Sequence, residues 1–186
     1  MTVDEQVAVL APETQRFARM GDRVCAMFLD FIVLFPLFWL VIAVIGVANG
    51  VYKGGNADLV GGPALLAFLI ITVVWIAFYL FTEYFFEGSP GKYVMGIKVT
   101  SLCEGRITIP QAVARNLLRP VDAVGFYLLG FVVAICSKQR QRIGDLAAGT
   151  VVVEMPEARR INPLLILIAS IIPTWGAVYF FQQFAQ

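Results

Sequence analysis

Long uninterrupted apolar runs divide the chain, and their lengths predict helices that cross a bilayer. The three clearest runs cover residues 24–47, 63–82 and 163–181. Each holds about 19–24 residues, and a helix that rises about 1.5 Å per residue needs roughly 20 to cross the hydrocarbon core. Only the first run contains a charged residue, Asp30. We therefore predict three transmembrane helices.

A fourth apolar segment, residues 117–136, is ambiguous. Arg119 and Asp122 lie near its start, which leaves about 14 uncharged residues, or roughly 21 Å of helix. This length favours a re-entrant segment, which enters the membrane and returns to the same side. A fourth transmembrane helix is the alternative. Both flanking segments are rich in lysine and arginine, and positively charged loops concentrate on the cytoplasmic side. We therefore expect the N-terminus and both basic segments in the cytoplasm and the C-terminal end outside.

Short β-branched stretches between the apolar runs predict a small sheet. Residues 95–100 and 106–109 have the pattern of two strands around a turn at Glu104 and Gly105, and residues 150–154 form a further strand. The predicted fold is thus an all-α integral membrane protein with three to four transmembrane helices, one of them re-entrant or spanning, and a small cytoplasmic β-element.

The same pattern predicts three units along the chain. Residues 1–20 form a cytoplasmic N-terminal tail, residues 21–155 a membrane domain, and residues 156–186 an additional C-terminal transmembrane helix. The tail is acidic before its first arginine, and the apolar run that follows exceeds the core of a signal peptide, which holds about 7–15 residues. We therefore expect the first helix to stay in the protein as an anchor.

Composition narrows the function classes. Hydrophobic residues make up 59% of the chain and charged residues 15%, against roughly 45–50% and about 25% in soluble domains. The chain has no histidine, and Cys25, Cys103 and Cys136 are far apart, so neither a metal site nor a disulfide framework is indicated. The hydroxyl groups have no histidine to activate them, and a net charge of +1 suggests no nucleic-acid partner. We expect no catalytic residues and no cofactor, and we do not expect an enzyme.

Asp30 is the most informative single position. It lies about six residues, or roughly 9 Å, inside the first apolar run. An acid at the centre of a membrane helix costs about 2.5–3.5 kcal/mol, so Asp30 needs a partner, a polar cavity or a proton. It is either an ion or proton site or half of a buried ion pair. Arg23 lies on the same helix face but roughly 10 Å away, so we expect the partner on another element, with Arg115 and Arg119 as candidates.

Spacing assigns local roles to the other charged residues. Arg119 and Asp122 can pair at i, i+3. Glu83 and Glu87 align at i, i+4 where the second apolar run ends, which indicates a solvated helix end more than a mouth that attracts cations.

The turn Gly88-Ser-Pro-Gly-Lys-Tyr93 superficially resembles a phosphate-binding loop. It lacks the four-residue gap between the glycines and the hydroxyl residue after the lysine, and no strand precedes it. We therefore expect a tight turn at the end of the second helix and no nucleotide site.

Four blocks of the sequence resemble the RDD family of membrane proteins. They are Arg23–Asp30, the turn Gly88–Val99, Ala114–Arg119 and Arg142–Val152, and the similarity extends over about residues 16 to 153. Their order and spacing make the resemblance specific, and residues 21–155 would then form the RDD-like domain.

The resemblance implies which residues matter. The family takes its name from one arginine and two aspartates, which fall here on Arg23, Asp30 and Asp145. On spacing alone Asp145 belongs to a solvated or interfacial turn, and the resemblance makes it a structural or functional partner instead. The candidate charge partners of the three signature residues are Arg115, Arg119, Asp122 and Arg142.

Two functions follow from this resemblance and from Asp30. The family's usual suggested role is transport of unknown ligands, so the first is a small protein of a bacterial inner membrane that transports an unidentified ligand, for example by cation/proton exchange at Asp30. The alternative is a non-transporting scaffold that recruits or stabilises other membrane proteins, in which the signature residues lock the helix packing. The expected partners are the lipid bilayer and further copies of the chain or other membrane proteins.

Overall fold

The computed structural model describes residues 16–53, 56–103, 105–122, 128–137 and 139–155, together with residues 162, 168, 172, 176, 179, 180 and 183. The third predicted span, residues 163–181, falls largely outside the described residues, and so does most of the predicted tail.

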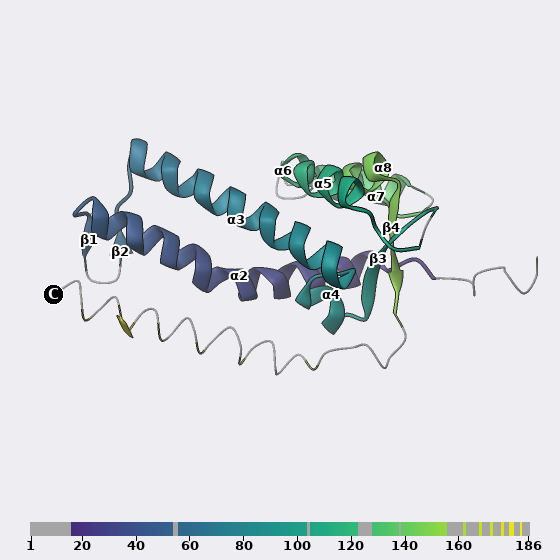
Figure 1. The fold of residues 1–186 in the computed structure, drawn as a ribbon, viewed down its shortest axis with the longest axis horizontal. Helices are drawn as coiled ribbons and strands as arrows, with labels where there is room; N and C mark the ends of the chain where they lie inside the picture. The colour runs from purple at the N-terminus through teal and green to yellow at the C-terminus, as the bar shows by residue number, and fades with distance from the viewer. Residues whose placement is uncertain are drawn as a thin grey trace, which may run out of the picture.

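Two long apolar helices form the body of the structure and lie side by side along its longest axis (Figure 1). Helix α2 covers Met20–Ala48 and helix α3 covers Gly62–Phe86. Both are long and apolar enough to cross a membrane, and they contain the first two predicted runs. The antiparallel strands β1 (Tyr52–Lys53) and β2 (Asn56–Ala57) join them at one end.

The side chains of α2 and α3 point outward in a way that suits lipid. Phe28 is 61% exposed, and Phe68 and Val73 are each 65% exposed. Such a large apolar surface is unfavourable in water and is neutral against hydrocarbon. After Asp30 the helix carries no charge as far as Ala48, which gives roughly 27 Å of apolar length, close to the thickness of a bilayer core.

The remaining described elements gather at the opposite end of α2 and α3 from the β1–β2 hairpin (Figure 1). We call this assembly of residues 90–155 the cap. It contains α4 (Pro90–Val94), β3 (Ile97–Ser101), α5 (Ile109–Leu117), α6 (Arg119–Asp122), α7 (Leu128–Cys136), α8 (Ile143–Ala148) and β4 (Thr150–Glu154).

Strands β3 and β4 pair antiparallel, with Ile97 opposite Glu154 and Ser101 opposite Thr150. The sheet packs its apolar face on the first turns of α2, where the buried core of the cap forms. The core residues are Ala18, Ala26, Ile97, Val99, Ile107, Ala112 and Val152. This core joins the sheet to the end of the α2–α3 pair.

The predicted strand at residues 106–109 does not form. Thr108 instead caps α5, because its side chain binds the backbone of the first turn while the Gln111 side chain binds back to Thr108. Pro110 in the first turn also suits a helix start. This reciprocal capping box is a helix signal that outweighs the β-branched residues around it.

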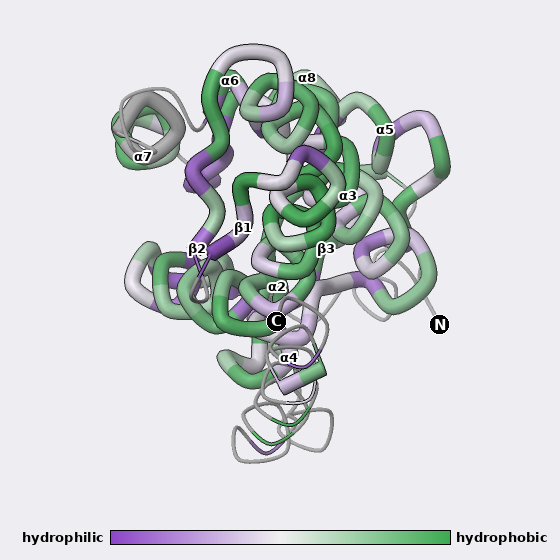
Figure 2. The backbone as a smooth tube through the Cα atoms, turned by 90° about the vertical axis from the view of Figure 1, so that its left-hand side faces the viewer, coloured by the Kyte–Doolittle hydropathy of each residue, from purple (hydrophilic) through white to green (hydrophobic). Residues whose placement is uncertain are grey.

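The ambiguous segment 117–136 is described only in part. Helix α5 ends at Leu117, α6 covers Arg119–Asp122 and α7 covers Leu128–Cys136, and residues 123–127 between the last two lie outside the described residues. Figure 2 shows α7 to one side of the α2–α3 pair. Its re-entry into the membrane stays a prediction.

Helix α4 approaches the backbone of α2 very closely at Gly91. A Cβ atom added at Gly91 would lie 2.1 Å from the carbonyl oxygen of Ala26 and 2.9 Å from Oδ1 of Asp30. The backbone of α2 cannot retreat without breaking its own hydrogen bonds, so only glycine fits at residue 91.

We predict that Gly91→Ala destabilises the protein by about 3 kcal/mol, at the upper end for overpacking, because the methyl group forces α4 away from α2. Thermal unfolding of the detergent-purified protein measures the change. Gly88→Ala is the matched control, since a Cβ at Gly88 meets its nearest neighbours at 3.5 Å or more. Equal melting temperatures for the two variants would contradict the prediction.

Candidate functional site

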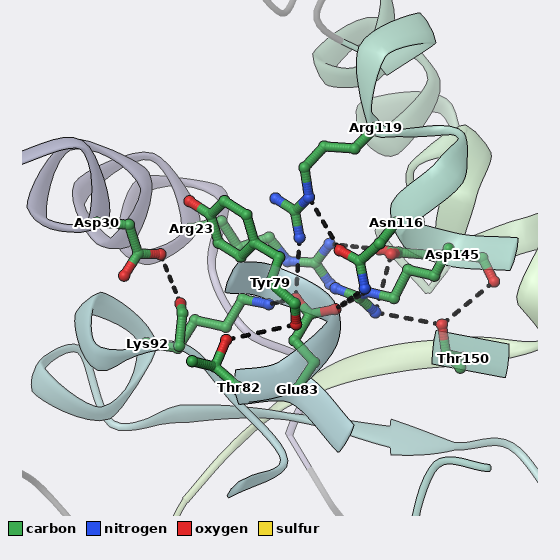
Figure 3. Close-up of polar contacts among 12 residues, drawn as sticks. Arg23, Asp30, Tyr79, Thr82, Glu83, Lys92, Asn116, Arg119, Asp145 and Thr150 are labelled. Carbon is green, nitrogen blue, oxygen red and sulfur yellow. Dashed lines mark hydrogen bonds and ion pairs between the residues drawn. The ribbon is translucent and has the colours of Figure 1, made fainter. Parts of the chain in front are cut away.

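Charged side chains from six helices meet where the cap covers the ends of α2 and α3 (Figure 3). We call this group the charged cluster. Most of its members are almost completely buried, so each must be paired or hydrogen-bonded to be tolerated. The members are Arg23, Asp30, Glu83, Lys92, Arg115, Arg119, Asp122, Arg142 and Asp145.

Glu83, near the end of α3, is the centre of the cluster. Its Oε2 atom lies 3.0 Å from Nε of Arg115 and accepts a hydrogen bond of 2.9 Å from Nδ2 of Asn116. Its Oε1 atom accepts hydrogen bonds from Nη2 of Arg119, at 3.0 Å, and from Nζ of Lys92. One carboxylate on a membrane helix thus binds cations from three elements of the cap.

Asp145 on α8 is the second anionic centre. Its Oδ1 atom lies 3.0 Å from Nη1 of Arg115, and its Oδ2 atom accepts a hydrogen bond of 3.1 Å from Nη1 of Arg23. Arg115 therefore bridges Glu83 and Asp145. Burial raises the pKa of Asp145, but the coulombic attraction of Arg115, Arg142 and Arg23 outweighs burial and holds this pKa well below its usual range.

Asp30 is held differently from the other buried acids. Its Oδ2 atom accepts a hydrogen bond of 2.5 Å from the hydroxyl of Ser89, and its Oδ1 atom accepts one of 2.7 Å from the backbone N–H of Gly91. Among the described residues it forms no ion pair within 4.0 Å. The expectation that Arg115 or Arg119 pairs with Asp30 is wrong, because both arginines bind Glu83.

The turn at residues 88–93 does bind an oxyanion, but the oxyanion is a side chain of the protein. Ser89 and Gly91 stand at the start of α4, where backbone N–H groups lack partners within the helix. Asp30 occupies this position from the neighbouring helix. The glycine-rich turn therefore fastens α4 to α2.

A cavity of about 80 Å³ lies beside the cluster. Asp30 and the apolar side chains of Met20, Val24 and Met27 form part of its wall. The other residues that line it are Tyr79 and Val152 and the cationic residues Arg23, Lys92, Arg115, Arg119 and Arg142.

The model of the RDD family matches residues 17–149, which include α2 through α8. The chain belongs to the RDD family. No curated protein and no solved structure matches it.

The RDD signature therefore separates into two contacts in the structure. Its arginine, Arg23, pairs with its second aspartate, Asp145, and not with Asp30 on the same helix. The first aspartate, Asp30, is bound by the turn before α4. The candidate partner Arg115 links to this signature through Asp145, and Arg142 lies 3.7 Å from the same carboxylate.

Two expectations about local pairing are wrong. Glu83 was expected at a solvated helix end beside Glu87, whereas it is fully buried and binds the cap. Arg119 was expected to pair with Asp122, but Arg119 binds Glu83 and Asp122 lies 4.0 Å from Nε of Arg142. Tertiary contacts outweigh the i, i+3 and i, i+4 spacings in both places.

Sequence reasoning also missed Lys92, Ser89 and Asn116. Lys92 and Ser89 lie in the turn that was read only as a helix exit, and Asn116 lies inside the resemblance block Ala114–Arg119. One signal was available for Glu83, because it is the first charge after about 20 uncharged residues and so lies where a membrane helix meets the polar boundary.

We predict that Glu83→Gln destabilises the protein by about 3–5 kcal/mol, because it leaves buried cations without their carboxylate. Glu87→Gln is the matched control, since Glu87 is partly exposed and its pairs with Lys98 and Arg106 contribute less than about 1 kcal/mol. Thermal unfolding in detergent compares the two variants. A Glu83→Gln protein as stable as Glu87→Gln would refute a central role for Glu83.

Burial lowers the pKa of Lys92 to about 7, although the Glu83 carboxylate raises it. The two arginines beside Glu83 lower this pKa further. Between this pKa and the usual 10.5 the unfolded chain binds more protons than the folded chain. The contribution of Lys92 to the free energy of unfolding therefore rises with pH between about pH 7 and 10.5.

We predict that Lys92→Met removes this pH dependence and lowers the slope of unfolding free energy against pH by up to about 1.4 kcal/mol per pH unit. Chemical unfolding between about pH 7 and 10 measures the slope. Lys53→Met, in the exposed β1 strand, is the control and should keep the wild-type slope. Parallel curves for wild type and Lys92→Met would disprove the prediction.

Proposed function

We propose that this RDD protein is a non-enzymatic transporter of a bacterial inner membrane that exchanges a cation for a proton, with Asp30 as the exchanging carboxylate. The observation that supports this most is the bonding of Asp30. It is a buried acid on a membrane helix, it lines a cavity, and its oxygens accept hydrogen bonds from two neutral donors, the Ser89 hydroxyl and the Gly91 backbone N–H. Such a carboxylate can bind a proton or a cation without first losing an ion pair.

The other buried acids are less suited to exchange. Glu83 binds Arg115, Arg119 and Lys92, and Asp145 lies among further arginines. Protonation of either acid would leave buried cations uncompensated, which costs several kcal/mol. Asp30 can therefore change its charge at a lower cost to the rest of the fold than Glu83 or Asp145.

The proposal includes an orientation and an assembly. The cap carries most of the chain's basic residues, so by the positive-inside rule it lies in the cytoplasm together with the N-terminus. Helices α2 and α3 expose apolar side chains on several faces, and two helices cannot enclose a polar path. Even with the predicted third span, the chain has few helices to enclose a path along Asp30, so we expect further helices from other copies of the chain or from other membrane proteins.

A specific observation also favours the scaffold as a second candidate. Glu83 on α3 binds side chains of α5 and α6, and Arg115 continues the connection from α5 to α8 through Asp145. These four helices are thus fixed to one another by contacts that pair most of the buried charges. In a scaffold, Asp30 would only clamp α4 to α2, and the rigid cap would present a surface to a partner.

We predict that Asp30→Asn abolishes cation/proton exchange and leaves a folded protein. The amide keeps an acceptor for Gly91 but cannot release a proton or balance a cation. Proton movement in response to sodium or potassium gradients, measured with the protein in proteoliposomes, tests this. Asp58→Asn, in the loop before α3, is the matched control with an exposed acid.

The stability of the same variant separates the two candidates. A folded but inactive Asp30→Asn protein supports transport, whereas undiminished exchange would refute it. Absence of exchange in the wild type, combined with a large fall in melting temperature for Asp30→Asn, would favour the scaffold.

A further inference from the structure

Several buried guanidinium nitrogens in the charged cluster lack an acceptor. In the described part of the chain, Nε and Nη2 of Arg23 and Nη2 of Arg115 have neither a hydrogen bond nor an ion-pair contact. The side chain of Arg23 is 9% exposed and that of Arg115 is 0% exposed. Buried charged donors without acceptors are costly, and both side chains line the same cavity beside Asp30.

More cationic than acidic side chains line this cavity. Its wall holds cationic side chains of the cluster and one acid, Asp30, while Glu83 and Asp145 lie behind the arginines. The guanidinium groups already use some of their N–H donors on these carboxylates, and the remaining donors face no acceptor. Oxyanions such as phosphate match the fork of N–H donors that an arginine presents.

An apolar groove of about 600 Å³ adjoins the cavity. It runs between α2 and α3 and includes Phe31, Phe38, Phe68 and Trp75. Tyr79 and Met27 line both spaces, so the groove meets the cavity at these two residues. The cavity at the end of the helix is cationic, and the groove that continues from it along the helix is apolar. This arrangement matches a phospholipid, which has a charged headgroup and apolar acyl chains. The phosphate lies at the membrane boundary and the acyl chain lies within it.

We propose that an anionic phospholipid binds here, with its phosphate on Arg23 and Arg115 and one acyl chain in the groove between α2 and α3. The C-terminal segment, residues 162–186, could compete for the groove, but it contains no acidic side chain and cannot supply the anion in the cavity. The bound phosphate supplies the missing acceptors and offsets positive charge beside Asp30. The evidence for this site does not rest on the proposed transport, because it consists only of the contacts of the arginines and the groove.

The test measures binding of phosphatidylglycerol to the full chain purified in detergent, by native mass spectrometry and by the shift in melting temperature. Phosphatidylcholine is the control lipid, because its choline group opposes the cationic wall, and inorganic phosphate is the control for an anion without a chain. We expect phosphatidylglycerol to bind at least about tenfold more tightly than phosphatidylcholine. Equal binding of the two lipids, or binding of inorganic phosphate alone, would overturn the proposal.

Two variants test the two halves of the site. Arg23→Lys keeps a cation for Asp145 but removes the unpaired donors, so binding should weaken about tenfold. Arg106→Lys, an exposed arginine outside the cavity, should bind like the wild type. Met27→Trp should fill the junction and prevent lipid binding, whereas Phe35→Trp, which does not line the groove, should not.

These outcomes are separate from the proposed transport. Wild-type affinity in both Arg23→Lys and Met27→Trp would refute the lipid site and leave the flux experiment unaffected. Lipid binding that appears only after removal of residues 162–186 would also refute it, because the groove would then belong to the chain itself. Specific lipid binding in a protein without exchange activity would support the lipid site alone.

Discussion

The structure depends on the placement of one carboxylate, Glu83, at the boundary between an apolar helix and a charged cap. A charge at this position is costly alone and is tolerated because Arg115, Arg119 and Lys92 bind it from separate elements. Those cations are costly to bury in turn, and they require Glu83. This mutual requirement fixes the ends of α3, α4, α5 and α6 together, and Arg115 extends the connection to α8 through Asp145.

The second constraint is the contact of α4 with α2, which decides the environment of Asp30. Gly91 allows the two backbones to approach so closely that its N–H reaches the carboxylate. Ser89 supplies the other donor from the same turn. A short helix start can therefore satisfy an acid without a counter-ion, and this leaves Arg23 free to pair with Asp145. The three signature residues therefore form two separate contacts, Arg23 with Asp145 and Asp30 with the turn before α4, and α2 takes part in both.

The long helices and the paired strands could be predicted from the sequence, because they follow from the order of apolar, polar and β-branched residues along the chain. The apolar runs predict α2 and α3, and the β-branched residues at 97–101 and 150–154 lie in paired strands. The strand expected at residues 106–109 is lost to a capping box that the sequence contained in Thr108 and Gln111. Glu83 could not be placed by pattern, because its role comes from cations far away along the chain. Helical spacing reports neighbours on one helix, and every partner of Glu83 lies outside α3.

The separation of roles among the buried acids bears on function. Where a buried acid is bound by several arginines, it stabilises the fold and its charge is fixed by them. Where it is bound by a hydroxyl and a backbone N–H, its charge can change without breaking an ion pair. Asp30 is of the second kind, and it lies on the same cavity wall as the unpaired nitrogens of Arg23 and Arg115. A cation approaching Asp30 would be repelled by that wall unless an anion were bound there. An anionic lipid on Arg23 and a cation at Asp30 would therefore favour each other's binding, and this coupling connects the two proposed sites.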